Sequence, residues 1–333
     1  MTTDVAVIGA GSWGTVLADL LARKGLNVSI WAYEAEVADA IATYHTNPLY
    51  LPHASLAPSL RASHDLLDVV SGASLICSVV PSHISRQVFT TIAPHVAPGT
   101  VLVCATKGID TVTLQLMGDV ARDTIPHATF VALSGPSFAE EVLAGQPTAI
   151  VAASNDAAAA VQVQRLFSTP TFRVYSNDDV CGVTLGGSIK NTIAIAAGIV
   201  EGLQLGNNPR AALLTRGLAE LARLGEAMGG RTETFAGLAG MGDLILTCTG
   251  ALSRNRQLGV ALAHGTTLDE YHHAHRTVVE GVNTAKAAVR LAERHNVDMP
   301  ITRQVAAVLF DNVSPRESIQ LLMDRTLKAE RWT

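Results

Sequence analysis

Short apolar runs alternate with stretches of helical spacing in the first half of the chain. Most of the runs are apolar at nearly every position, which is typical of strands buried on both faces. They lie at residues 4–8, 27–31, 73–80, 100–105, 129–133, 149–152 and 171–175. Helical spacing follows at 15–21, 34–44 and 156–167, whereas the proline-containing stretch 46–58 indicates loop or short strand. The alternation predicts a parallel, doubly wound α/β sheet.

The pattern changes at about Asp178. Strand-like runs disappear, and helical spacing continues to the end of the chain, interrupted by Gly and Asn clusters near residues 206–209, 229–230 and 237–242. The longest apolar stretch is short, at 193–200, and no run approaches the roughly 18 residues that span a bilayer. We therefore expect a Rossmann-like domain at residues 1–177 and an all-helical domain at residues 178–333.

A glycine pattern connects the first expected strand to the first expected helix. Gly9, Gly11 and Gly14 have the G-x-G-x-x-G spacing of a dinucleotide-binding turn. Gly9 would make the tight turn, Gly11 would let the backbone approach a pyrophosphate, and Gly14 would let the helix pack on the strand. The first amides of that helix would point toward the anion. Because this glycine pattern follows an expected strand and precedes an expected helix, it favours a dinucleotide-binding site over an ordinary tight turn.

Polar residues follow three further expected strands, at 81–83, 106–108 and 134–137. In a doubly wound sheet these ends share the edge where ligands bind. Lys107 stands there as a cation for a substrate anion or as a solvated loop lysine. Ser137 begins the stretch Ser-Phe-Ala-Glu140, which has capping-box spacing, so its hydroxyl contacts a ligand or caps a helix.

The residues after the second expected strand bear on the coenzyme. Glu34 lies about 20 residues beyond Gly14, where an acid often holds the adenosine ribose and favours NAD. The alternative interpretation is an acid at the N-terminal end of a helix, where the helix dipole favours it. The sequence leaves the choice between NAD and NADP open.

Lys190 is the single lysine in an apolar helical stretch at residues 183–203. Burial disfavours the charged form of a lysine and lowers its pKa, which suits acid–base chemistry. The alternative is a lysine whose stem crosses apolar surface and whose ammonium group reaches water.

Two further stretches carry candidate chemistry in the second half. Arg254 and Arg256 lie in the first turn of an expected helix, where cations oppose the helix dipole. Either an anion held by Arg254 and Asn255 explains them, or they are two exposed arginines that cost little stability. Asp243 is a lone acid between apolar residues that would fix a hydroxyl or cap a helix.

Composition narrows the functional classes. The net charge is −5 and no Lys/Arg block is present, which disfavours nucleic-acid binding. The four cysteines form no C-x-x-C pair, and no basic region precedes an apolar run at the N-terminus, so a reduced cytoplasmic protein is expected. A histidine cluster at 272–275 has no matching acid or cysteine ligands, and we expect no metal site.

Taken together, the motifs resemble those of the bacterial-type NAD(P)-dependent glycerol-3-phosphate dehydrogenases, essentially from end to end. They are GAGSWGT (9–15), VVPSH (79–83), ATKG (105–108), SGPSFAEE (134–141), GGSIKN (186–191), GDLILTCT (242–249), SRNR (253–256) and VVEG (278–281). The resemblance implies hydride transfer between NADH or NADPH and dihydroxyacetone phosphate, yielding sn-glycerol 3-phosphate for glycerophospholipid synthesis. It also implies a homodimer, whereas the cytoplasmic location and the lack of membrane insertion are expected from the composition and the short apolar runs.

The resemblance assigns residues as well. It implies that Lys190 is the proton acceptor and donor at the substrate C2 oxygen. The implied substrate-binding residues are Lys107, Gly135, Ser137, Lys190, Asp243, Ser253, Arg254 and Asn255. The implied coenzyme-binding residues are Gly9, Gly11, Ser12, Trp13, Gly14, Tyr33, Lys107, Ala139, Arg254, Val278 and Glu280. Tyr33 stands where the family often has a basic residue.

Two alternatives remain at this point. One is a two-domain dehydrogenase of a 3-hydroxy acid or a keto acid, which would need a carboxylate clamp in place of the Ser-Arg-Asn stretch. The other is a coenzyme-sensing protein without catalysis, which the presence of Lys190 disfavours.

Overall fold

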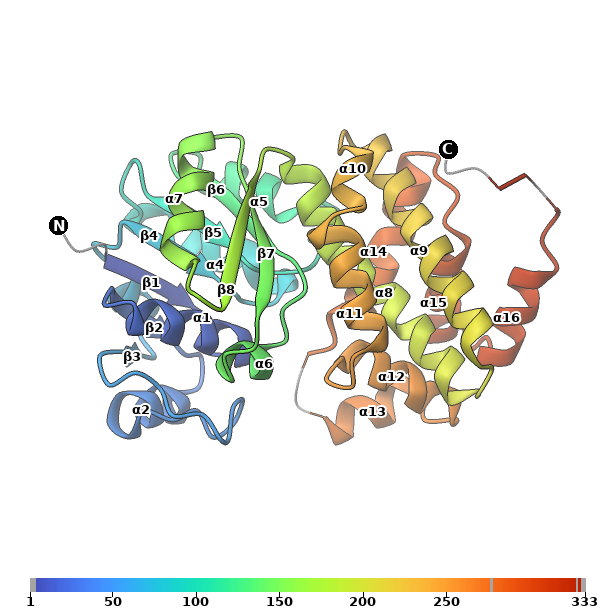
Figure 1. Ribbon diagram of the computed structural model, residues 1–333, viewed down its shortest axis with the longest axis horizontal. Coiled ribbons are helices and arrows are strands. Elements are labelled where there is room, and N and C mark those ends of the chain that lie inside the picture. The colour runs from blue at the N-terminus through green and yellow to red at the C-terminus, as the bar shows by residue number, and fades with distance from the viewer. Residues whose placement is uncertain (1–3, 276–277, 328, 331–333) are drawn as a thin grey trace. The chain divides into compact units, whose positions relative to one another are not determined.

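The computed structural model describes residues 4–275, 278–327, 329 and 330 of the chain (Figure 1). The chain divides into two compact units. The first unit comprises Met1–Thr106 and Met117–Val180, and the second comprises Lys107–Leu116 and Cys181–Thr333. The division near residue 180 lies three residues beyond the expected one. The stretch Lys107–Leu116 lies within the expected first domain, yet it packs with the second unit.

The first unit contains an eight-stranded sheet in the order β3-β2-β1-β4-β5-β6-β7-β8. The strands are β1 (Asp4–Ile8), β2 (Asn27–Trp31), β3 (Arg61–Ser63), β4 (Leu75–Ser78), β5 (Val101–Cys104), β6 (Thr129–Ser134), β7 (Thr148–Ala153) and β8 (Phe172–Asn177). All seven runs expected from the apolar pattern are strands. The edge strand β3 was not expected, because Arg-Ala-Ser is short and polar at both ends.

The expectation of a wholly parallel sheet is wrong at one position. β7 runs antiparallel to β6, with Leu133 opposite Ala152, whereas all other neighbouring strands are parallel. The connection between these two strands contains only the five-residue helix α6 (Ala139–Leu143), whereas parallel crossovers usually carry a longer helix.

Alternate residues of the central strands face two different hydrophobic clusters. In β1, Val5 and Val7 belong to the cluster that includes residues of α1 and α7, whereas Ala6 and Ile8 belong to the cluster with α4 and α5. Both faces of β1 are therefore covered, as a near-continuous apolar strand requires. The helices of this unit are α1 (Ser12–Arg23), α2 (Ala35–Tyr44), α3 (Leu66–Val70), α4 (Ser82–Ile92), the 3-10 helix η1 (Ala93–His95), α5 (Met117–Thr124), α6 and α7 (Ala157–Phe167).

The described part of the second unit contains helices and no strands, as expected. They are α8 (Val180–Gly202), α9 (Asn207–Ala227), α10 (Thr232–Phe235), η2 (Leu238–Gly242), α11 (Asp243–Thr249), α12 (Arg254–Ala263), α13 (Leu268–Ala274), α14 (Glu280–Arg294), α15 (Pro300–Phe310) and α16 (Pro315–Met323). Every residue of α8 from Gly182 to Val200 is buried. Helix α8 is thus the central helix of this unit.

Helix α8 also corrects an expectation about apolar length. Its 23 residues are long and apolar enough to cross a membrane by length and composition, although no such run was expected. Its apolar stretch lies wholly inside the folded unit, as in the core helix of a packed bundle. The segment from α10 to α11 and the helix α12, which are bent relative to each other, are long and apolar enough to cross a membrane only when they are counted as one span.

Glycines allow α8 and α12 to touch through their backbones. A Cβ built on Gly198 would overlap the carbonyl oxygen of Arg256, and one on Gly259 would overlap that of Ile195. At both glycines, backbone atoms of the other helix occupy the place where a Cβ would stand, so no larger residue fits there. This contact sets the separation between the middle of α8 and the first turns of α12.

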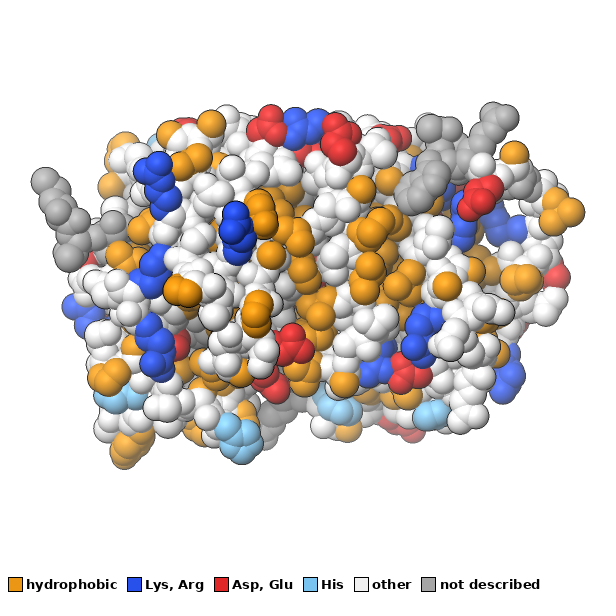
Figure 2. Space-filling view, in the orientation of Figure 1, with side chains coloured by type: hydrophobic (Ala, Val, Ile, Leu, Met, Phe, Trp, Pro, Cys, Tyr) orange, Lys and Arg blue, Asp and Glu red, His pale blue; other side chains and the backbone are white. Residues whose placement is uncertain are grey.

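Charged side chains show no single-sign concentration on the face drawn in Figure 2. Blue Lys and Arg side chains lie scattered among uncharged and acidic ones, as the sequence leads one to expect. All four cysteines are free, and Cys77, Cys104 and Cys248 are buried. Burial raises the pKa of the Cys104 thiol to about 11, so this thiol stays protonated at neutral pH.

The glycine turn has the backbone geometry of its three expected roles. Gly9 has φ +110°, a left-handed conformation that favours glycine. A Cβ on Gly14 would overlap the carbonyl oxygen of Gly9, so α1 packs on the turn without a side chain between them. At Gly11, no atom lies within 4 Å of the Cβ position. The turn is therefore closed at Gly14 and open at Gly11.

Substituting these two glycines should separate folding from ligand approach. Gly14→Ala should destabilise the protein by roughly 1–3 kcal/mol, because the added methyl overlaps backbone. Gly11→Ala should leave the melting temperature nearly unchanged, because its methyl meets open space. Thermal unfolding of both variants without ligand checks this expectation, and equal losses of stability in the two variants would contradict it.

A buried carboxylate stabilises the start of α15. Glu220 of α9 is 1% exposed and accepts hydrogen bonds from the amides of Ile301 (2.6 Å) and Thr302 (3.0 Å) and from the Thr302 hydroxyl. It satisfies donors that the helix itself leaves without partners. Burial nevertheless raises the pKa of Glu220 to about 6, and the hydrogen bonds only partly oppose that shift.

This raised pKa predicts a pH-dependent stability. Between about pH 4.5 and 6 the folded protein holds the Glu220 proton more tightly than the unfolded chain, so stability falls as pH rises through this window. The contribution is on the order of 2 kcal/mol. Denaturant unfolding should be measured across this pH window for the wild type and for Glu220→Gln. The free energy of unfolding should fall more steeply with pH in the wild type than in the variant. Parallel pH dependences would contradict the assignment.

Candidate active site

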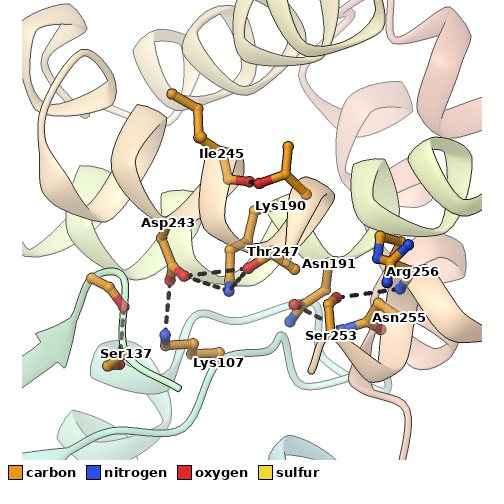
Figure 3. Close-up of polar contacts among 12 residues, drawn as sticks. Lys107, Ser137, Lys190, Asn191, Asp243, Ile245, Thr247, Ser253, Asn255 and Arg256 are labelled. Atoms are coloured by element: carbon orange, nitrogen blue, oxygen red, sulfur yellow. Dashed lines mark hydrogen bonds and ion pairs between the residues drawn. The ribbon is translucent and has the colours of Figure 1, made fainter. Parts of the chain in front are cut away.

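Two lysines share one buried carboxylate in the second unit. Lys190 of α8 donates to Oδ1 of Asp243 at 2.6 Å, and Lys107 donates to Oδ2 of the same residue at 2.8 Å (Figure 3). Asp243, the first residue of α11, is 1% exposed, and the side chains of Lys190 and Lys107 are 6% and 18% exposed. The alternative of a surface lysine is therefore wrong for Lys190, and the solvated-loop alternative is wrong for Lys107.

A threonine completes this group and was not anticipated from the sequence. Lys190 Nζ also donates to the Thr247 hydroxyl, which in turn donates to Asp243 Oδ1 at 3.3 Å. Thr247 lies four residues after Asp243 on α11 and therefore on the same helix face. That spacing is the sequence signal that identifies it once Asp243 is known to point inward.

The electrostatic environment disfavours the charged form of Lys190. Burial lowers the pKa of Lys190 to about 8, the Asp243 carboxylate opposes the shift, and the Lys107 ammonium adds to it. The contact with Asp243 is thus too weak to keep this ammonium at its usual pKa. Lys190 exchanges a proton near neutral pH, as a general acid and base must. Cys248, beside it, stays a thiol because burial raises its pKa to about 12.

A second polar group joins α8, α12 and α14. Asn255 of α12 donates from Nδ2 to Oδ1 of Asn191 at 3.0 Å, and Asn255 Oδ1 accepts from the Gly281 amide at 2.9 Å. A Cβ on Gly281 would lie 2.7 Å from the Asn191 carbonyl oxygen, so the close approach needs glycine. Asn191 follows Lys190 directly and was not singled out beforehand. This group ties the Lys190 turn of α8 to the first turn of α12.

Contacts within the protein account for the position of one of the two arginines in the first turn of α12, without a ligand. Arg256 pairs with Glu201 and donates from Nε to the Gly250 carbonyl at 3.0 Å. Ser253 is the N-cap, and its hydroxyl accepts from the Arg256 amide at 3.3 Å. Arg254 is exposed at the first position of the helix. Arg256 therefore needs no bound anion to explain its position, and Arg254 is the arginine of this turn that we keep as a candidate for anion binding.

In the first unit, Ser12 and Trp13 begin α1 directly after the glycine turn. The Ser12 hydroxyl donates to the Tyr50 carbonyl at 2.8 Å, and the Trp13 ring lies tilted against Phe172, with 6.2 Å between centroids. Tyr33 is 81% exposed after β2. No side chain caps α1, and the open space at Gly11 lets a pyrophosphate approach its N-terminal amides. The turn thus fits a dinucleotide.

The capping-box interpretation of Ser137 is wrong. Its hydroxyl donates to the Gly135 carbonyl at 3.1 Å, and the N-cap of α6 is Phe138, which makes no side-chain cap. Gly135 has φ +138°, and its Cβ position lies 2.9 Å from Ile150 Cα, so backbone packing requires glycine there. Ala139 is the first residue of α6.

The remaining candidates have ordinary positions in the second unit. Val278 is 38% exposed, and Glu280 lies in the first turn of α14. Among the residues that the structure describes, no group of three His, Cys, Asp or Glu side chains could hold a metal ion.

Comparisons with known proteins identify the family of the chain. The model of the NAD-dependent glycerol-3-phosphate dehydrogenase N-terminus matches residues 4–160, and that of the C-terminus matches residues 179–320. The chain is 53% identical to the glycerol-3-phosphate dehydrogenase [NAD(P)+] of Geobacter sulfurreducens, over 100% of both chains. It is 50% identical to the enzyme of the same name from Koribacter versatilis, over 98% of this chain and 99% of that one.

A solved structure carries the same architecture. The glycerol-3-phosphate dehydrogenase of Coxiella burnetii is 41% identical, with a TM-score of 0.94 over 97% of this chain and 99% of that one. Identity at this level over the full length, together with the two matching models, shows the family. The chain belongs to the NAD-dependent glycerol-3-phosphate dehydrogenase family.

Proposed function

We propose that this protein interconverts dihydroxyacetone phosphate and sn-glycerol 3-phosphate with NAD(H) or NADP(H). The observation that carries the proposal is the buried Lys190, which contacts Asp243 and still has a pKa lowered to about 8. An amine that is neutral or charged near physiological pH serves both directions of an alcohol–ketone reaction. The family membership supplies the substrate and the coenzyme class.

The glycine turn and the start of α1 would hold the coenzyme. Gly9 and Gly14 shape the turn, and the open side at Gly11 admits the pyrophosphate. When bound, the nicotinamide supplies or accepts the hydride. The further coenzyme residues that we infer from the family motifs are Ser12, Trp13, Tyr33, Lys107, Ala139, Arg254, Val278 and Glu280.

Lys190 would move the proton at the substrate C2 oxygen. In the reducing direction its ammonium donates a proton to that oxygen, and in the oxidising direction its neutral amine accepts one. Asp243 and Thr247 hold Nζ in place through the contacts described above. Lys107 occupies the second carboxylate oxygen of Asp243, which limits how strongly Asp243 retains the proton on Lys190.

The start of α12 would bind the substrate phosphate. Arg254 is an exposed cation at the first helical position, and α12 adds its N-terminal amides. Asn255 is held by Asn191, and Ser253 by its capping bond. We infer that Gly135, Ser137 and Lys107 also contact substrate, from the family motifs that they match.

We further infer a physiological setting from the family. The reduced product would enter glycerophospholipid synthesis, and the protein would act in the cytoplasm as a homodimer. The free cysteines are compatible with a reduced compartment. The net charge of −5, with no Lys/Arg block in the sequence, disfavours a nucleic-acid partner. The burial of α8 supports a core role for this apolar helix and no membrane insertion.

Removing Lys190 should separate turnover from coenzyme binding. Lys190→Ala should reduce turnover of dihydroxyacetone phosphate by at least about a hundredfold, since general acid–base catalysis typically contributes that much. NADH binding, measured by fluorescence titration, should persist. Lys286→Ala, an exposed lysine of the same unit, serves as the control and should retain activity. Near-normal turnover in Lys190→Ala, or keto-acid reduction in place of dihydroxyacetone phosphate reduction, would refute the proposal.

The pH dependence of kcat/KM should reflect the ionisation of Lys190. Ketone reduction needs the ammonium form, so its rate should fall as pH rises through about 8. Alcohol oxidation needs the neutral amine, so its rate should rise through the same region. Asp243→Asn removes a charge that raises this pKa, and the residual activity should show an acid-shifted profile. A basic shift would exclude Lys190 as the titrating group.

Arg254 should act on substrates that carry a phosphate. Arg254→Ala should raise the KM for dihydroxyacetone phosphate by about tenfold or more, because a charge-assisted contact is lost. At saturating NADH, which offsets any loss of coenzyme affinity, turnover of unphosphorylated dihydroxyacetone should change little. Arg303→Ala, another exposed arginine of this unit, provides the matched control. Unchanged KM values for both dihydroxyacetone phosphate and NADH would place Arg254 outside the site.

A further inference from the structure

A chain of hydrogen bonds in the first unit links the start of α1 to an acid beyond β2. The Ser12 hydroxyl donates to the Tyr50 carbonyl at 2.8 Å, and the Tyr50 hydroxyl donates to Oε1 of Glu34 at 2.7 Å. Glu34 immediately precedes α2 but makes no side-chain cap with it. The helix dipole favours an acid at this position whether or not it caps the helix, and the hydrogen bond from Tyr50 fixes where the carboxylate lies.

Glu34 follows the strand beside the glycine turn. β1 and β2 are parallel neighbours with Ile8 opposite Trp31, and the Gly9 amide donates to the Trp31 carbonyl at 3.0 Å. The glycine turn and Glu34 thus leave adjacent strands at the same edge of the sheet. In a dinucleotide-binding unit, an acid at this place accepts hydrogen bonds from the ribose hydroxyls of the adenosine half.

The loop that carries Tyr50 is anchored on the glycine turn. Asn47, fully buried, donates from Nδ2 to the Ala10 carbonyl at 2.8 Å and to the Thr15 hydroxyl at 2.9 Å. Its Oδ1 accepts from the Tyr50 amide at 3.2 Å. Tyr50 is therefore held through its amide, its carbonyl and its hydroxyl. The position of Glu34 relative to the turn is set by side-chain contacts as well as by the sheet.

The charges around Glu34 disfavour a second phosphate. The sequence contains no Lys or Arg between Lys24 and Arg61, although it contains three acids there, Glu34, Glu36 and Asp39. Lys24 lies at the far end of α1, where it donates to carbonyls at the end of α7. Arg61 pairs in register with Ser29, two residues before the end of β2.

We propose that Glu34, held by Tyr50, makes this protein bind NAD(H) in preference to NADP(H). A ribose 2′-hydroxyl donates a hydrogen bond to the carboxylate, whereas a 2′-phosphate places like charges together. The side chain of Tyr33, directly before it, carries no cation that would offset this repulsion. This inference rests on the proposed function only in taking a nicotinamide dinucleotide as the coenzyme.

Binding of each coenzyme to the full-length protein without a second substrate tests the preference. Fluorescence titration should give a dissociation constant for NADH about tenfold or more below that for NADPH. Glu34→Gln keeps the size of the side chain and removes its charge, so it should narrow this ratio, mainly by improving NADPH binding. Tyr50→Phe should weaken NADH binding several-fold with little effect on NADPH.

The control is Glu36→Gln, which makes the same change of charge at an exposed position two residues away. It should leave the ratio within about twofold of the wild-type value. Tighter binding of NADPH than NADH by the wild type, equal binding of the two, or an equal effect of the two Gln variants would overturn the proposal. Melting temperatures of all variants establish that each is folded.

The outcome is separable from that of the proposed function. Selective NADH binding without reduction of dihydroxyacetone phosphate would sustain the role of Glu34 and refute the reaction. Reduction of dihydroxyacetone phosphate with NADPH as the better coenzyme would support the reaction and refute the role of Glu34.

Discussion

The sharing of one carboxylate by two ammonium groups is the constraint on which the active site depends. Asp243 places one oxygen on Lys190 and the other on Lys107, and it is almost completely buried. A carboxylate devoted to Lys190 alone would hold its proton more strongly. With Lys107 on the second oxygen, burial outweighs attraction, and the pKa of Lys190 falls to about 8. The cluster therefore favours proton exchange over a permanently charged pair.

This arrangement requires a helix that can be surrounded on all sides. Helix α8 is buried along nearly its whole length, and its glycines let neighbouring backbones approach it. At Gly198 that neighbour is α12, whose first turn carries the substrate-binding residues that we propose. Asn191 then joins the Lys190 turn of α8 to Asn255. Backbone contact and side-chain amides thus fix the position of the α12 first turn relative to the reactive amine.

Local patterns predicted most of the fold, and they failed where distant parts of the chain decide. Apolar runs located seven strands, but they do not report that β7 runs antiparallel to its neighbour β6. A single lysine in an apolar helix indicated Lys190. Its contact with Thr247 spans 57 residues, and no local pattern reports such a contact. The sequence around Arg256 suggests a bound anion, but its partner in the structure is Glu201, 55 residues earlier in the last turn of α8, which no local pattern reveals.

The charge balance of the cluster connects its stability to its chemistry. When both lysines are protonated, two positive charges face one negative charge in a largely dry environment. Such uncompensated buried charge costs folding free energy, so hydrophobic residues in these positions would make a more stable protein. Loss of the Lys190 proton leaves one balanced pair, Lys107 with Asp243. In the reaction that we propose, donation of the Lys190 proton to the substrate would remove this charge imbalance.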